Sequence, residues 1–152
     1  MLAGAAGGTV GGLLISALML GIERLDGGPN ELVVLGRRAA EALGSPYRYN
    51  PAHPAVEEQL MSHGGHLLLS ALLGALYPPA RRLPGPDGAL GGLVFGAGVY
   101  AALWGVVGPA LRLTPTPRQE GAAVVARRLG IHLGFGLVTA LIAGRLERSA
   151  SR

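Results

Sequence analysis

Four long stretches that are almost free of charge constrain this chain more than any other feature. They cover residues 2–22, 60–77, 88–109 and 126–145. A helix needs about 20 mostly apolar residues to cross the hydrocarbon core of a bilayer. Charged residues make up only 14% of the chain, against roughly 25% in a typical soluble domain. We therefore expect one all-α membrane domain over residues 1–152, an integral membrane four-helix bundle.

Glycines spaced by four recur within these stretches. At this spacing they lie on one stripe of a helix and let a neighbouring backbone approach closely. The spacing predicts helix contacts at Gly4, Gly8, Gly12, Gly88, Gly92, Gly96, Gly130 and Gly134.

The segment between the first two spans predicts a short amphipathic helix over about residues 31–43. Asn30 is a favourable cap before it, and Glu31 suits its first turn. Leu32, Leu35, Ala39 and Leu43 then share one face. We expect this helix to lie on the membrane surface or on the end of the bundle, with Tyr47 and Tyr49 near the interface; docking on a partner protein is the alternative.

The chain resembles a duplicated hairpin. Gly65-His66-Leu67 opens one apolar run, and Ile131-His132-Leu133 opens a looser copy of it. Two hairpins joined head to tail would be related by a pseudo-twofold axis along the membrane normal. That symmetry would place His66 and His132 at a similar depth, near the first and third loops.

Helix boundaries carry their own signals. Pro54 favours the start of the second span, and Pro78-Pro79 its end. Thr116-Pro117-Arg118-Gln119 reads as a capping box that opens the fourth helix.

His63, His66 and His132 form a candidate polar or ligand site inside the membrane, where ionisable groups are costly. Interhelical hydrogen bonding is the first interpretation. A haem or metal ligand pair and a proton-responsive site are the others. Glu57 and Glu58 lie near His63, but a solvated first turn is the favoured reading for them. No catalytic residue, metal site or cofactor is assigned, and the chain contains no Cys.

Several motifs resemble the YagU-type group of small bacterial inner-membrane proteins. The resemblance rests on His66 with Ser70, Gly74 and Tyr77, on Pro109 and Leu113-Thr114-Pro115, and on Gly130, His132-Leu133 and Gly136. It implies four helices in a bacterial inner membrane, a link to acid tolerance for some members, and no known reaction. A carboxylate is expected one turn before the last histidine, where this chain has Arg128.

These features favour a non-catalytic accessory or scaffold protein, a homo-oligomer or subunit of a larger complex in the lipid bilayer. The alternatives are a small proton-linked channel or transporter, or a haem- or metal-binding bundle using His66 and His132. An enzyme is not expected. Nucleic acid is not expected either, because the arginines mostly flank apolar runs, where they anchor helix ends. The count of arginines at each end places the long first loop in the cytoplasm.

Overall fold

A computed structural model describes residues 1–46, 48–81 and 85–152 as an all-α structure. Tyr47 and Arg82 lie outside these residues. The elements are α1 (Leu2–Asp26), α2 (Glu31–Ala42), α3 (Val56–Ala75), α4 (Tyr77–Ala80), α5 (Gly88–Tyr100), the π-helix η1 (Ala101–Val107), α6 (Gly108–Ala110) and α7 (Ala122–Ala150). Within the described residues, four helical stretches are long and apolar enough to cross a membrane: Leu2–Asp26, Val56–Ala80, Gly88–Ala110 and Ala122–Ala150. The expected four-helix membrane fold is confirmed.

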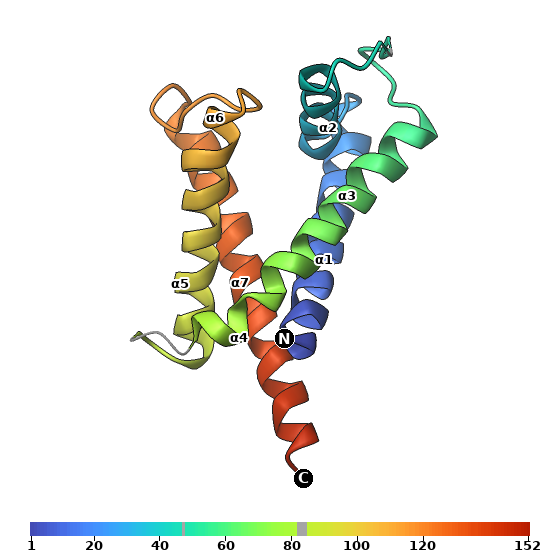
Figure 1. Cartoon of the computed structure of the whole chain (residues 1–152). Helices are drawn as coiled ribbons and strands as arrows, with labels where there is room; N and C mark the ends of the chain where they lie inside the picture. The colour runs from blue at the N-terminus through green and yellow to red at the C-terminus, as the bar shows by residue number, and fades with distance from the viewer. Residues whose placement is uncertain (47, 82–84) are drawn as a thin grey trace.

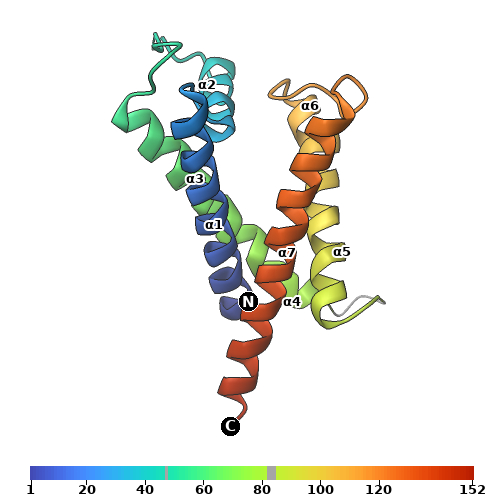
Figure 2. The same cartoon turned by 180° about the vertical axis from the view of Figure 1, so that it is seen from behind.

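The helices form two arms that meet at one end and diverge toward the other (Figures 1 and 2). The first arm holds α1, α2 and α3, and the second holds α5, η1, α6 and α7. Both chain termini lie at the end where the arms meet, here called the termini end. The opposite end carries α2 and the connection before α7, and is called the loop-rich end. Many leucines on the outer faces are exposed, among them Leu14, Leu68 and Leu72, as suits helices surrounded by lipid.

Glycine brings α1 and α3 into backbone contact. A Cβ placed on Gly74 would lie 2.6 Å from the Cα of Gly8 and would also strike the carbonyl oxygen of Gly4. A Cβ on Gly12 would lie 2.7 Å from the side chain of Ser70. Three of the predicted packing glycines, Gly4, Gly8 and Gly12, therefore lie at this interface.

A second stripe of α1 faces α7. A Cβ on Gly7 would lie 2.6 Å from the carbonyl oxygen of Thr139, and one on Gly11 would lie 2.9 Å from the Phe135 ring. Thr139 and Phe135 are buried. This contact between α1 and α7 joins the two arms. The described residues of α3 and α5 share no comparable contact, although a twofold axis between the hairpins would require one.

The crossing of α5 with α7 repeats that of α1 with α3. A Cβ on Gly136 would lie 2.7 Å from the Cα of Gly96 and would strike the carbonyl oxygen of Gly92, the pattern seen at Gly74. When the two hairpins are aligned so that Gly74 corresponds to Gly136, Ser70 corresponds to His132. The two hairpins are thus alike in their packing, but in a register one helical turn away from the expected pairing of His66 with His132.

The remaining predicted packing glycines have open space around them. No atom of the described residues lies within 4 Å of a Cβ on Gly88, Gly130 or Gly134. Gly88 has a positive φ of 63° at the start of α5, so it serves a turn. On α7, Gly136 makes the contact with α5. It lies on the inward face of the helix with His132, Phe135, Thr139 and Ala140, whereas Gly130 and Gly134 lie on the outward face.

Two helix boundaries differ from those the sequence predicts. Thr116 and Gln119 do bond through their side chains, at 2.9 Å, but they close an isolated turn and α7 begins at Ala122. Pro78 and Pro79 do not end the second span; they lie in the first turn of α4, where a missing N–H costs nothing. Asn30 caps α2 as expected, since its side-chain oxygen accepts hydrogen bonds from the N–H groups of Leu32 and Val33.

The α5–α7 crossing gives a testable prediction. Gly96→Val should lower the free energy of unfolding by about 1–3 kcal/mol or more, because the added side chain strikes the backbone of His132. Gly98→Val is the matched control, since open space surrounds Gly98 on the same helix. Thermal unfolding in detergent measures both. Equal loss of stability in the two variants would contradict the close crossing.

Candidate functional site

A cavity of about 200 Å³ lies between the two arms. Its wall comes from α1, α2, α3, α5, η1 and α7, and from the connection that follows α6. Apolar side chains dominate the wall, and His66 and His132 both contribute to it. The structure therefore brings two of the three candidate histidines to one cavity, although His66 and His132 do not occupy equivalent positions in the two hairpins.

His132 has both ring nitrogens engaged. Its Nδ1 lies 2.8 Å from the carbonyl oxygen of Arg128, one turn earlier on α7, so Nδ1–H donates there. The indole N–H of Trp104 donates to Nε2 at 3.3 Å. These two contacts fix one neutral tautomer, in which neither nitrogen is free for a metal or a haem iron.

Trp104 lies within the π-helix η1. The wider turn of a π-helix is uncommon and often marks a functional position. The guanidinium carbon of Arg128 lies 3.8 Å from the centre of the Trp104 ring, a cation–π contact. Trp104 thus stacks on Arg128 and bonds His132 at once, and it ties the second arm's two long helices together.

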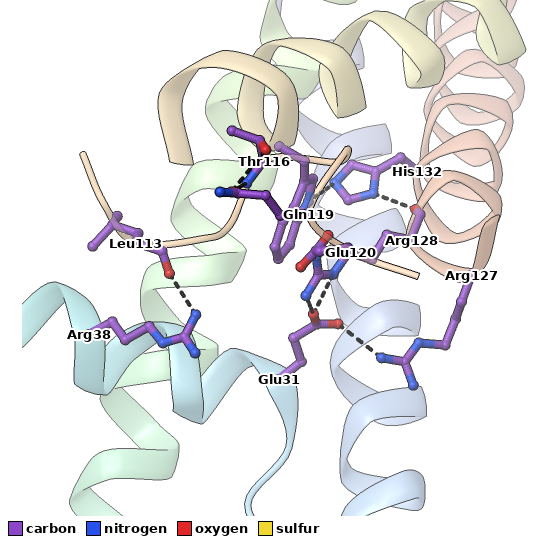
Figure 3. Close-up of polar contacts among 10 residues, drawn as sticks. Glu31, Arg38, Leu113, Thr116, Gln119, Glu120, Arg127, Arg128 and His132 are labelled. Atoms are coloured by element: carbon purple, nitrogen blue, oxygen red, sulfur yellow. Dashed lines mark hydrogen bonds and ion pairs between the residues drawn. The ribbon is translucent and has the colours of Figure 1, made fainter. Parts of the chain in front are cut away.

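Arg128 is the centre of an ion cluster (Figure 3). Its guanidinium pairs with Glu31 at the start of α2 and with Glu120 just before α7. Arg127 reaches the same Glu31 carboxylate at 3.7 Å. The side chains of Arg128 and Glu120 are only 11% and 10% exposed. Two arginines and two glutamates leave the cluster neutral, which makes burial of its charges tolerable.

The cluster connects the arms at the loop-rich end. Glu31 belongs to the first arm, and Arg127 and Arg128 belong to the second. A further link is the hydrogen bond from Arg38 of α2 to the carbonyl oxygen of Leu113, at 2.9 Å (Figure 3). Polar contacts close this end of the cavity, while glycine contacts hold the arms at the termini end.

His63 belongs to a separate network within the first arm. The side-chain N–H groups of Asn30 donate to Glu23 and approach His63 Nε2 at 3.4 Å. Gln59 also donates to Glu23. The network joins the end of α1, the cap of α2 and the first turns of α3. His63 is therefore not assembled with His132.

A salt bridge fixes α2 on α3. Arg37 Nε lies 2.8 Å from Glu58 Oε1, and both side chains are largely buried. Gly36 packs against Ser62, and Val33 is fully buried. Glu58 is therefore not in a solvated first turn as the sequence favoured, because its carboxylate is largely buried against Arg37. No group of three His, Cys, Asp or Glu side chains among the described residues is placed to hold a metal ion.

The Nε2 of His66 is buried and has no hydrogen-bond partner among the described residues, and the same holds for the Nδ1 of His63. His66 lines the cavity and also an adjoining groove of about 630 Å³ between α2 and α3. His53 is exposed in the loop before α3.

Sequence reasoning missed Glu31, Glu120 and Trp104 as members of the site. The available signal was Arg128 itself, because an arginine next to an apolar span needs a compensating charge. The sequence does not say which carboxylates supply it, since Glu31 lies 97 residues away.

No protein-family model, curated protein or solved structure matches the chain. The four candidate spans among the described residues indicate a multi-pass membrane protein.

The ion cluster gives a second prediction. Glu31→Gln and Arg128→Gln, made singly and together, should give a coupling free energy of about 1.5–3 kcal/mol in a double-mutant cycle, because the pair is largely buried. The pair Arg81–Glu147, with both side chains about a third exposed, is the control, and its coupling should stay below about 1 kcal/mol. Unfolding in detergent measures both cycles. Similar couplings would refute the buried bridge between the arms.

Proposed function

We propose that the protein is a non-catalytic accessory or scaffold subunit that acts by packing with itself or with another membrane protein. One observation carries the proposal. Gly130 and Gly134 lie four residues apart on the exposed face of α7, with open space beside both. Leu141 extends that face and is 48% exposed. Glycines at this spacing permit close approach of another helix, and this chain leaves the position unfilled.

The state of the polar groups supports a structural role. Arg128, Glu31 and Glu120 pair with one another, and His132 uses both ring nitrogens in hydrogen bonds. A catalytic group needs a free lone pair or proton within reach of a substrate. The buried charges at the loop-rich end instead hold the two arms together. This arrangement favours a protein that acts by binding other proteins at its surface.

The two alternatives have less support. A haem or metal pair requires free nitrogens on His66 and His132, and those of His132 are engaged. A proton-linked transporter draws some support from the cavity that both histidines line. Its walls are mostly apolar, however, and its charged groups are paired, so a hydrated ion would find few ligands there.

The resemblance to the YagU-type group extends the proposal to a bacterial inner membrane. This resemblance rests on the sequence motifs alone. The departure at Arg128 gains a rationale from the geometry, since two carboxylates from other segments neutralise this residue.

The exposed glycines yield a third prediction. Gly130→Ile with Gly134→Ile should raise the dissociation constant for self-association by at least about tenfold, equal to about 1.4 kcal/mol, because the larger side chains prevent close helix approach. Energy transfer between labelled chains in vesicles, measured over a range of lipid-to-protein ratios, gives the constant.

The matched control is Gly21→Ile. This glycine is also exposed on a spanning helix with nothing near it, but it has no glycine four residues away. A wild-type protein that is monomeric at every dilution, and that crosslinks to no other protein in native membranes, would overturn the proposal.

A further inference from the structure

We propose that the cavity between the arms binds one acyl chain of a phospholipid, which serves as a structural part of the protein. This inference is independent of the α7 face. It starts from the position of the cavity, which is lined by residues from all four candidate spans and lies toward the loop-rich end. The molecules available to fill it in a membrane are lipids, water and protein segments.

The apolar wall of the cavity disfavours water as the occupant. Leu32, Leu69, Leu103, Ile131 and Phe135 are typical of its lining. A buried water needs two to four polar partners, and cavities with apolar walls stay dry. The nitrogens of His132 are already bonded, and Nε2 of His66 is covered by neighbouring atoms. A dry void of this size removes van der Waals contacts from its walls and is unfavourable when empty.

The enclosure of the cavity favours a thin occupant. Side chains of α1, α2, α3, α5, η1 and α7 converge on it. An α-helix with its side chains is about 10–12 Å across, so a segment of a second copy would need these elements to move apart. A single hydrocarbon chain is much thinner and can bend to follow the walls. The occupant is therefore a chain of methylene groups, and not a segment of a second copy.

The cavity has a continuation that suits the rest of such a chain. It shares Leu32, Leu35, Leu69 and Leu113 with the groove of about 630 Å³ between α2 and α3. This arrangement explains the orientation of α2. That helix packs on α3 through Val33, Gly36 and Arg37, and its leucine face is left to line the cavity and the groove.

The charges at the closed end indicate that the tail enters and the headgroup does not. Arg128 lines the cavity, but Glu31 and Glu120 neutralise it. Among the described residues that line the cavity, no cation is left uncompensated to attract a phosphate. Binding should therefore depend on the acyl chain and be indifferent to the charge of the headgroup.

Trp104 provides a built-in probe, because it is the only tryptophan of the chain and it lines the cavity. The experiment titrates delipidated protein in detergent with phosphatidylcholine or phosphatidylglycerol carrying bromine on the acyl chains, which quenches indole fluorescence. We expect quenching to saturate at one lipid per chain with both headgroups. Unlabelled phospholipid should reverse it, and glycerophosphocholine, which has no acyl chain, should not.

The variant Leu35→Phe with Leu69→Phe fills the cavity and the groove and should lose the saturable quenching. The control Leu68→Phe with Leu72→Phe places the same rings on the outer face of α3, where both leucines are well exposed, and should keep it. The competition in wild-type protein needs no variant, so the proposal stays testable if the filled variant fails to fold. Quenching that never saturates in wild-type protein, that follows dimer formation, or that survives in a folded, filled variant would overturn it.

Discussion

The architecture depends on backbone contact at glycines, made three times near the termini end. Gly8 meets Gly74, Gly7 meets Thr139, and Gly96 meets Gly136. In lipid, burying an apolar side chain against another gains little over burying it against an acyl chain, so close van der Waals contact must hold the helices together. Such contact is possible only where no Cβ intervenes. α1 carries one stripe toward α3 and another toward α7, which makes it the helix that joins the two hairpins.

A different interaction takes over at the loop-rich end, where the arms have diverged. Their backbones are no longer in contact there, and Glu31, Arg128 and the bond from Arg38 to Leu113 join them instead. A charged pair can bridge a gap that small side chains cannot, because long side chains reach across it. Removing one partner of a largely buried pair leaves an uncompensated charge, so each member depends on the others. The cavity exists because packing at one end and polar bridges at the other leave the middle unfilled.

The sequence predicted what depends on local pattern. The four spans, the cap at Asn30 and the contacts of Gly4, Gly8 and Gly12 follow from hydropathy, short-range hydrogen bonding and spacing. The partners of Arg128 could not be predicted, because they come from segments that only the tertiary fold brings together. The prediction of which side of α7 packs was also wrong. Gly130 with Gly134 and Gly136 with Ala140 have the same spacing, and only the positions of the neighbouring helices decide which pair faces inward. The capping box at Thr116 formed its local bonds, yet Glu120 and Gly121 lie between that turn and α7, which leaves Glu120 in reach of Arg128.

Arg128, one turn before His132 on α7, determines the hydrogen bonds that His132 makes. A carboxylate at that position would accept a hydrogen bond from the ring and pair with its protonated form. Arg128 offers instead its backbone carbonyl to Nδ1–H, and its guanidinium supports the Trp104 ring that donates to Nε2. A second positive charge on the ring would face Arg128 and would lose the bond from Trp104. Both ring nitrogens of His132 are thereby engaged in hydrogen bonds, whereas the buried Nε2 of His66 has no hydrogen-bond partner among the described residues.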